Sequence, residues 1–451
     1  MELTILAIDI GTTSMKVGIF KIVRNKIELV SEQSEPYSIN TYNDGQFCDI
    51  EPVKWINALK KICLNIGEDK LKNIDLLSIS GTTPGITFLD KELQVIYPAI
   101  LMLDQRSRKE AASIIDLIGE KKLLEETGNL PVPGGCSLAS ILWIKNNHPD
   151  IFNRTRYFAH SNTFLGGWLT GNYKIDPSSA SLTALYNTAR NDFSWNKDIA
   201  DTFSVNIKTL PDIIPSYETL GRLKKDLAIE LGLKKRPHVI IGGNDAVLAA
   251  LSAGVKSAGD IININGTCEI TMVCLPRCIG SKNYNVRAHV IEGKWLTLHV
   301  LNAGGKAYEW FHSVFCSEMT IKDFFSVFVS KALNQSFAEQ VNEEYIPYLM
   351  GSRYSLEPLT ASFKNINIET TREDILRSVT KSLCKYQSKH IKEISKKIKI
   401  KNKIFVTGGC INDVIIEAKK KWMIDGKYVF KRQSSLKGAA LLAKMFMERH
   451  K

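Results

Sequence analysis

A strand–turn–strand pattern built on Gly-Thr occurs twice, and it constrains the fold more than any other feature of the 451 residues. The apolar run Leu3–Ile10 leads into Gly11-Thr12-Thr13, and a second apolar run follows. Much later, Asp260–Ile264 leads into Asn265-Gly266-Thr267 and another apolar run. Short apolar runs joined by tight turns predict antiparallel strands. We predict an internal duplication whose two hairpins face one cleft; two unrelated hairpins that share a turn by chance are the alternative.

The segments between the hairpins mix strands with helices. Residues 27–31 predict a third strand, and Asp49-Ile50-Glu51-Pro52 opens an amphipathic helix. Leu76–Ile79 predicts a further strand, and the apolar run 238–241 predicts another before a helix of small residues. This alternation predicts an α/β protein. A domain boundary is expected near residues 253–258, just before the second hairpin.

Composition excludes several classes of protein. Hydrophobic residues make up 44% and charged residues 24%, which excludes a disordered or fibrous chain. The 59 Lys and Arg outnumber the 47 Asp and Glu, and the net charge of +12 favours anionic partners. These include nucleic acids, acidic membranes and phosphorylated small molecules. The densest basic run, residues 396–403, is typical of a solvated helix face or turn, and no nucleic-acid-binding motif accompanies it.

Cysteine usage and hydropathy indicate the compartment. The nine cysteines are scattered and odd in number, which argues against a disulfide framework and for a reducing compartment. Cys274 and Cys278 have no matching second pair, so we expect ordinary thiols rather than a metal site. The N-terminal run reaches Asp9 after few apolar residues and predicts a buried strand, not a signal peptide. No uncharged apolar run of about 18 residues occurs. We therefore expect a cytoplasmic protein.

Acidic residues stand beside the glycines in both halves of the sequence. Asp9 precedes Gly11, and Asp245 follows Gly242-Gly243, each at the end of an apolar strand. A carboxylate there can act on Mg²⁺, directly or through water, or accept a proton from a hydroxyl nucleophile. Capping of the local turn is the alternative for both. The amides and hydroxyls of two facing Gly-Thr turns could hold adjacent phosphates, and Lys16 could reach a phosphate or face solvent.

A second pair of charged residues follows the apolar run 96–103. Asp104 and Arg106 could both point into a polyol pocket, because Asp accepts hydrogen bonds from hydroxyls and Arg donates them in a fork. A surface ion pair is the alternative. The chain has neither a Walker A pattern nor the HRD and DFG motifs of protein kinases.

Taken in order, these segments resemble the FGGY carbohydrate kinases of the actin, Hsp70 and hexokinase superfamily. The resemblance runs from Ala7 to about Ala443. The matching segments are residues 7–16, 49–55, 99–106, 142–149, 169–178, 242–245, 265–267, 408–412 and 438–440. The resemblance implies an α/β fold of two actin-like (ribonuclease H-like) domains, with mixed sheets around a central nucleotide and sugar cleft. Residues 1–253 would carry the sugar site and first phosphate loop, and residues 254–451 the second phosphate loop and adenosine site.

The resemblance also implies an activity and a set of site residues. ATP would donate its γ-phosphoryl group to a sugar hydroxyl, with Asp245 as general base and Asp9 acting on Mg²⁺ through water. The nucleotide-binding residues would be Asp9, Gly11, Thr12, Thr13, Lys16, Gly266, Thr267, Gly408, Gly409 and Asn412. The sugar-binding residues would be Thr83, Asp104, Arg106 and Asp245. The expected partners are a small-molecule sugar and ATP, with neither nucleic acid nor membrane, and a homodimer is a reasonable assembly.

The chain departs from the family pattern near the sugar. Met102 stands where many members have Trp, Ser140 occupies a usual Lys position, and Ser352 replaces Glu before an arginine. These changes spare the two acids and the Gly-Thr turns but leave the identity of the sugar open. The turn 266–269 (Gly-Thr-Cys-Glu) resembles that of L-fuculose kinases more than that of xylulose kinases. An L-fuculose-like ketose is therefore expected, with a pentulose such as D-xylulose or ribulose close behind.

Three other functions remain open. A non-catalytic relative that binds sugar or nucleotide would explain the departures, although it would have no need for both acids. An actin-like or Hsp70-like ATPase would turn over ATP without any sugar. A basic nucleic-acid binder would need residues 396–403 to form a patch with aromatic residues nearby, which the sequence does not offer.

Overall fold

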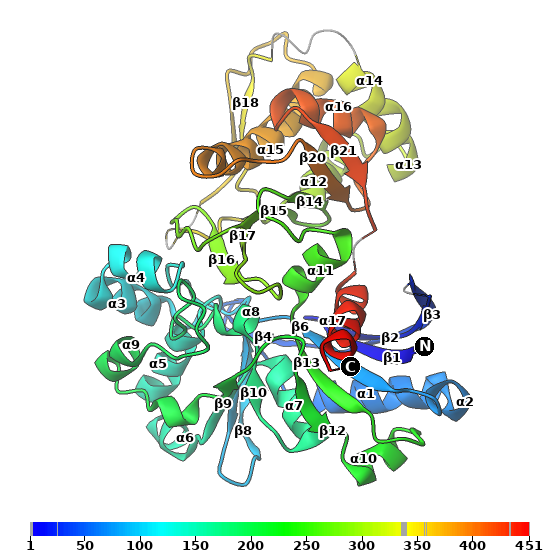
Figure 1. The fold of residues 1–451 in the computed structure, drawn as a ribbon. Coiled ribbons are helices and arrows are strands. Elements are labelled where there is room, and N and C mark those ends of the chain that lie inside the picture. Colours follow the sequence, from blue (N-terminus) through cyan, green and yellow to red (C-terminus); the bar gives the residue numbers. More distant parts are fainter. Residues whose placement is uncertain are drawn as a thin grey trace.

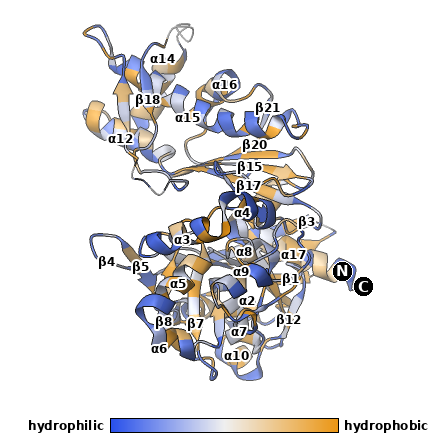
Figure 2. Ribbon diagram, turned by 90° about the vertical axis from the view of Figure 1, so that its left-hand side faces the viewer, coloured by the Kyte–Doolittle hydropathy of each residue, from blue (hydrophilic) through white to orange (hydrophobic). Residues whose placement is uncertain are grey.

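A computed structural model describes residues 3–24, 26–334, 341–355, 357, 359–432 and 434–450. It has two large halves, each built on a six-stranded mixed sheet (Figure 1). Hydrophobic residues gather along the strands of both sheets and on the helix faces that cover them (Figure 2). The mixed α/β class expected from the sequence is confirmed.

The first sheet has the strand order β12-β13-β6-β1-β2-β3. Its strands are β1 (Leu3–Ile10), β2 (Ser14–Val23), β3 (Lys26–Pro36), β6 (Leu76–Gly81), β12 (Thr219–Arg222) and β13 (His238–Asn244). The three N-terminal strands form the expected antiparallel meander. Strands β6 and β13 run parallel to β1. The C-terminal ends of β1, β6 and β13 therefore meet at one edge of the sheet.

The second sheet has the order β16-β17-β15-β14-β20-β21. Its strands are β14 (Ile261–Asn265), β15 (Glu269–Leu275), β16 (Asn285–Ala288), β17 (Trp295–Leu301), β20 (Lys403–Thr407) and β21 (Lys427–Phe430). Here β14 pairs antiparallel with β15, and β15 with β17, whereas β20 is parallel to β14 and β21 is parallel to β20. The five strands β17-β15-β14-β20-β21 thus repeat the order and directions of β3-β2-β1-β6-β13. This repeat supports the predicted duplication.

Helices cover both faces of the first sheet. Alternate residues of β1 point to opposite faces: Leu6 packs with α1 (Val53–Ile66) and α7 (Ser161–Thr170). Ile5 packs with α11 (Asp245–Ala253) and the C-terminal α17 (Ser435–Arg449). The chain therefore ends against the sheet in which it began, and the two termini lie close together in Figure 1.

A third, five-stranded sheet of order β4-β5-β8-β7-β9 joins the first half. Its strands are β4 (Asn40–Tyr42), β5 (Phe47–Ile50), β7 (Gly85–Leu89), β8 (Val95–Leu101) and β9 (Tyr157–Ala159). The sequence placed Asp49 at the opening of a helix. In the structure Asp49 lies within β5, and the helix begins at Val53, after Pro52. The reason is long-range pairing: Asp49 opposes Ile100 of β8.

The remaining elements complete both halves. The helices are α2 (Glu68–Leu71), α3 (Arg108–Ile118), α4 (Glu120–Glu126), α5 (Ser137–Asn147), α6 (Pro149–Arg154), α8 (Pro177–Ala180), α9 (Lys197–Thr202), η1 (Ile207–Thr209), α10 (Lys225–Glu230), α12 (Gly305–Phe315), α13 (Ile321–Asp323), η2 (Phe324–Phe328), α14 (Val329–Asn334), α15 (Arg372–Ser395) and α16 (Asp413–Trp422). The short strands are β10 (Lys174–Ile175), β11 (Asp212–Ile213), β18 (Glu344–Ile346) and β19 (Ser362–Lys364).

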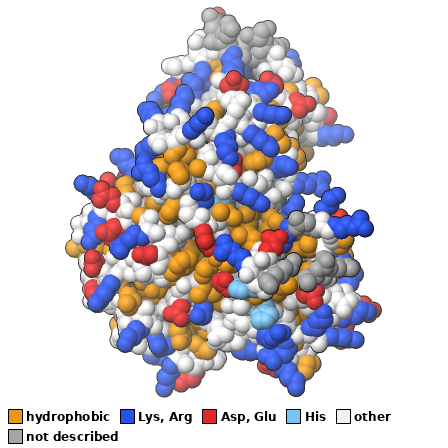
Figure 3. All heavy atoms as spheres, in the orientation of Figure 1, with side chains coloured by type: hydrophobic (Ala, Val, Ile, Leu, Met, Phe, Trp, Pro, Cys, Tyr) orange, Lys and Arg blue, Asp and Glu red, His pale blue; other side chains and the backbone are white. Residues whose placement is uncertain are grey.

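Surface charge is dispersed on the face that Figure 3 shows, where Lys and Arg side chains are spread over both halves. The lysines of the basic run 396–403 are exposed, as the sequence predicted; they follow α15 in an irregular segment, and Lys403 begins β20. All nine cysteines are free thiols. No helix within the described ranges is both long and apolar enough to cross a membrane.

Candidate active site

Two acidic residues meet at the edge where the parallel strands of the first sheet end. In the sheet register, Asp9 of β1 lies opposite Ser80 of β6, and Ser80 lies opposite Gly243 of β13. The Ser80 hydroxyl donates a hydrogen bond of 2.6 Å to Asp9 Oδ1. Asp245 is the first residue of α11, two positions beyond Gly243. The two predicted acids thus come together because parallel strands end at a common edge.

The carboxyl group of Asp245 has a pKa suited to proton transfer. Burial and the negative charge of Asp9 raise its pKa to about 6, against the lowering effect of Arg287. The Ala246 amide donates to Asp245 Oδ1 at 2.7 Å, and the Asn244 side-chain amide donates to the same oxygen at 3.0 Å. These bonds fix the carboxylate at the start of the helix.

A β-bulge in β13 places Asp245 at this edge of the sheet. The pairing of β13 with β6 shifts register between Ile240 and Gly243. Within the shift, Gly242 has φ +73°, and a Cβ atom there would lie 1.5 Å from the Ile79 carbonyl oxygen. Only glycine fits this backbone position. Asn244 then caps α11 by accepting a hydrogen bond from the Val247 amide, which fixes where the helix begins.

Thr83 belongs to the same cluster. Its hydroxyl accepts a 2.8 Å hydrogen bond from the Asn244 side-chain amide, and its side chain is buried. Thr83 lies in the loop between β6 and β7. The structure therefore brings Asp9, Thr83 and Asp245, three residues singled out from the sequence, to one place.

The two Gly-Thr turns are closed by different backbone hydrogen bonds. In the first, the Gly11 amide donates to the Ser14 carbonyl at 2.9 Å, and Lys16 lies exposed on β2, opposite Asp9. Thr12 is half-buried and Thr13 is exposed.

In the second turn, the Gly266 amide donates to the Cys268 carbonyl at 3.0 Å. The Gly305 amide at the start of α12 donates a hydrogen bond of 2.8 Å to the Gly266 carbonyl. Thr267 is exposed. Both turns thus present an exposed threonine hydroxyl.

Of the two predicted adenosine segments, residues 408–412 pack beside the second turn, whereas residues 438–440 lie in α17, where Gly438 packs against Leu248 of α11. Gly408 follows β20 with φ +117°, and a Cβ atom there would lie 2.0 Å from the Asn265 carbonyl oxygen. Gly409 faces open space. Asn412 caps α16 through a 2.9 Å hydrogen bond from the Ile415 amide. A small pocket behind the turn is lined by residues of both segments, including Asn265 and Cys410.

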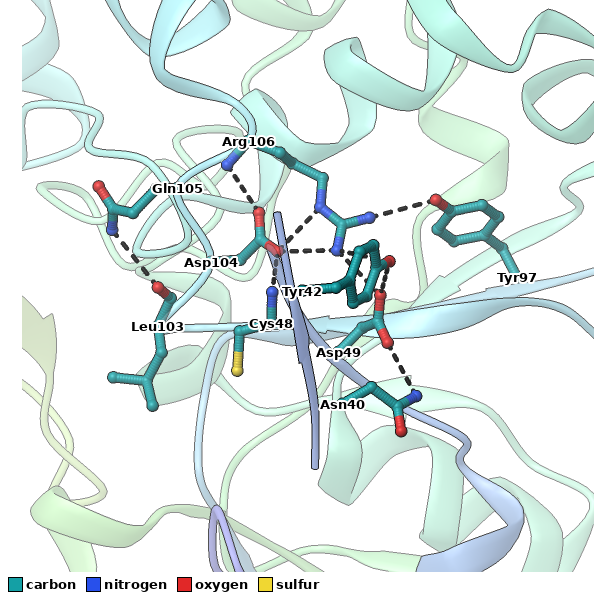
Figure 4. Close-up of polar contacts among 9 residues, drawn as sticks. All are labelled: Asn40, Tyr42, Cys48, Asp49, Tyr97, Leu103, Asp104, Gln105 and Arg106. Carbon is teal, nitrogen blue, oxygen red and sulfur yellow. Dashed lines mark hydrogen bonds and ion pairs between the residues drawn. The ribbon is translucent and has the colours of Figure 1, made fainter. Parts of the chain in front are cut away.

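Asp104 and Arg106 lie in a buried network rather than in a surface ion pair (Figure 4). Arg106 Nε donates to Asp104 Oδ2 at 2.8 Å, and its Nη2 pairs with Asp49 Oδ2 at 2.9 Å. The Cys48 amide also donates to Asp104, at 2.6 Å. The Arg106 and Asp104 side chains are 0% exposed. This network braces the loop after β8, and direct contact with a sugar remains a prediction for both residues.

Two arginines in this region were missed from the sequence. Arg287 of β16 donates through Nη1 to Asn244 Oδ1 and lies within electrostatic reach of Asp245. Arg353 donates through Nε to Asn302 Oδ1 at 2.7 Å, and its other nitrogens approach Met102 and Cys268. The sequence signal for Arg353 was its neighbour Ser352, which was already noted as a departure from the family pattern. No sequence signal marks Arg287.

Comparison with known proteins gives one family. The N-terminal domain model of the FGGY family of carbohydrate kinases matches residues 4–252. A xylulose kinase of Lactococcus lactis is 27% identical over 424 residues, which cover 92% of this chain and 81% of that protein.

Solved structures share the fold. A ligand-bound xylulose kinase from Lactobacillus acidophilus superposes with a TM-score of 0.89 at 18% identity, covering 99% of this chain and 90% of that one. A gluconate kinase from the same organism also gives a TM-score of 0.89 at 18% identity, covering 100% of this chain and 90% of that one.

Proposed function

The chain belongs to the FGGY family of carbohydrate kinases, and from that premise we propose that it phosphorylates a ketose with Asp245 as the general base. The observation that carries this assignment is the position of Asp245. It stands at the start of α11 with a pKa of about 6, beside Asp9. A carboxylate with that pKa is ionised at neutral pH and can still accept a proton during the reaction.

The proposed reaction is one in-line displacement. The sugar hydroxyl gives its proton to the Asp245 carboxylate, and the hydroxyl oxygen forms a bond to the γ-phosphorus of ATP. The bond from that phosphorus to the β–γ bridging oxygen breaks, and ADP leaves with the electron pair. Little covalent chemistry is required of the protein, so catalysis rests on positioning and on charge stabilisation.

The phosphates would be held by the turns at residues 11–13 and 266–267, with Lys16 nearby. Thr13 and Thr267 are exposed and available for this role. The adenosine would lie against Gly408, Gly409 and Asn412, beside the second turn.

The acids fit a divalent cation. Asp9 is close enough to Asp245 for its charge to raise the pKa of Asp245, and such a concentration of negative charge favours Mg²⁺. Asp9 would hold the ion through water, with its carboxylate fixed by Ser80. When bound, Mg²⁺ neutralises charge on the phosphates.

For the sugar we propose D-xylulose first, because curated relatives such as that of Lactococcus lactis are named xylulose kinases. L-fuculose is the second candidate. Its support is the sequence of the second turn, Gly266-Thr267-Cys268-Glu269, which resembles that of L-fuculose kinases. We also propose a cytoplasmic enzyme, in keeping with nine free thiols, and a homodimer as its assembly.

The test is ADP release from Mg-ATP with a panel of sugars and a no-sugar blank. The panel contains D-xylulose, D-ribulose, L-fuculose, L-rhamnulose, L-fucose, glycerol and gluconate. Stimulation by one ketose well above the blank is expected, and it would identify the substrate. Equal turnover with and without sugar would indicate an ATPase, and a flat panel with intact ATP binding would indicate a non-catalytic binder.

A further inference from the structure

Two arginines from the C-terminal half, Arg287 and Arg353, lie within electrostatic reach of each other. Arg287 is on β16 and Arg353 follows Gly351, 66 positions later in the sequence. Burial lowers the pKa of Arg287 to about 10, and the charge of Arg353 adds to that lowering, against the raising effect of Asp245. Like charges disfavour each other, and an additional anion bound beside both arginines would offset that repulsion.

Arg287 is a buried cation with incomplete partners. The residue is 6% exposed, and its Nη1 donates to Asn244 Oδ1. Its Nε finds no hydrogen-bond partner among the residues that the structure describes. Within the described part of the chain, no carboxylate lies within the 4.0 Å ion-pair distance of this guanidinium. A buried charge in this state is costly, so a ligand that supplies an acceptor gains from binding there.

Arg353 has one strong partner and two weak ones. Its Nε is held by Asn302 Oδ1 at 2.7 Å. Its Nη1 lies 3.9 Å from the Met102 sulfur, and its Nη2 lies 3.7 Å from the Cys268 sulfur. Sulfur is a weak acceptor, and the remaining N–H groups of the fork can serve an incoming oxyanion.

The neighbours of the two arginines place them between the base and a phosphate turn. Arg287 contacts Asn244, the residue before Asp245. Arg353 contacts Cys268, the residue after Thr267, and also Met102 in the loop that follows β8. Arg353 therefore joins the half that carries the base to the half that carries the second turn.

We propose that Arg287 and Arg353 bind the phosphoryl group during its transfer from ATP to the sugar. This inference rests on the proposed kinase function and adds a third phosphate-binding element to the two Gly-Thr turns. The bonds that form and break are those of the displacement given above. The guanidinium groups donate hydrogen bonds to the equatorial oxygens of the phosphoryl group and stabilise their charge. We assign the oxyanion as the γ-phosphoryl group rather than a carboxylate of the sugar, because Arg353 Nη2 lies 3.7 Å from the sulfur of Cys268, the residue after the proposed phosphate turn at 266–267.

The test compares nucleotides with and without the γ-phosphoryl group. Calorimetry would measure the Kd of ADP and of a non-hydrolysable ATP analogue for wild type, Arg353→Met, Arg353→Lys and Arg287→Lys. Arg190→Met, which removes a guanidinium that is 70% exposed, is the charge-matched control. We expect Arg353→Met to weaken the analogue by about tenfold or more while the Kd of ADP stays near that of wild type. These binding measurements report on the arginines even if no sugar supports turnover, so the two proposals can fail separately.

Steady-state kinetics give the second readout. We expect Arg353→Met to lower kcat by roughly 10³-fold with little change in the KM of the sugar, and Arg353→Lys to retain part of the rate. Added guanidinium should restore part of the activity of Arg353→Ala. An equal increase in the Kd of ADP and of the ATP analogue would overturn the proposal. A change confined to the KM of the sugar would also overturn it and would assign the arginines to sugar binding. Because Arg287 is buried, the Arg287→Lys result counts only if the Tm of that variant matches wild type. If it does not, the Arg353 variants alone test the proposal.

Discussion

The negative charge of Asp9 raises the pKa of Asp245, and this coupling sets the pH range of the proposed base. The pKa of Asp245 is raised by burial and by Asp9, so the carboxylate form is lost as the pH falls through about 6. A general base must be ionised before it can accept the proton. Activity should therefore fall on the acid side near pH 6.

We predict that Asp9→Asn moves this acid limb of kcat/KM to lower pH, because the substitution removes a charge that raises the pKa of Asp245. It should also raise the Mg²⁺ concentration needed for half-maximal rate. The measurement is a pH profile of sugar-dependent ADP release, with Asp150→Asn on the exposed α6 as the control. An acid limb that stays in place or moves upward would contradict the coupling.

The network around Arg106 is expected to serve stability. Asp49→Asn removes one of two carboxylates that face a fully buried guanidinium. Breaking a buried ion pair from one side leaves an uncompensated charge, and we predict a loss of about 3 kcal/mol in the free energy of unfolding. Urea denaturation measures it, with Asp69→Asn, whose side chain is 98% exposed, as the control. An unchanged denaturation midpoint for Asp49→Asn would show that Asp104 alone balances Arg106.

Among the elements, the bulge in β13 has the strictest sequence requirement. Gly242→Ala would place a Cβ atom 1.5 Å from the Ile79 carbonyl oxygen at a positive φ. We predict a loss of about 3 kcal/mol or more in stability, together with misplacement of Asp245. Gly409→Ala, where nothing lies within 4 Å of the new Cβ atom, should leave the Tm unchanged. A Gly242→Ala protein with the Tm of wild type would contradict this role for the bulge.

Local patterns predicted some elements and missed others. The meander of β1, β2 and β3 follows from adjacent apolar runs and tight turns, and it was predicted correctly. The strand that holds Asp49 was not, because its pairing partner β8 lies some 50 positions away in the sequence. The same reason explains why Arg287 and Arg353 were not predicted as site residues. No local pattern connects them with the site, since only the folded chain brings Arg287 of β16 to Asn244 and Arg353 to Met102 and Cys268.

At the scale of the whole molecule, the C-terminal helix ties the two halves together. The chain leaves the second sheet after β21, and α17 returns to pack on β1 and α11 of the first half. A domain division at residue 253 stays a prediction, and α17, which belongs to residues 254–451, lies against the first sheet. The family resemblance, the order of its segments and the fold class were all available from the sequence, because they depend on motifs spread over the whole chain.

The central claim is that Asp245 accepts the proton of the sugar hydroxyl. The most direct test is sugar-dependent ADP release by Asp245→Asn, measured beside ATP binding and the Tm of the same protein. Asparagine keeps the shape of the side chain but cannot act as the base. The account predicts a fall in kcat of about 10²–10⁴-fold, with ATP binding nearly intact and no loss of thermal stability at neutral pH. Sugar-dependent turnover near the wild-type rate would contradict it.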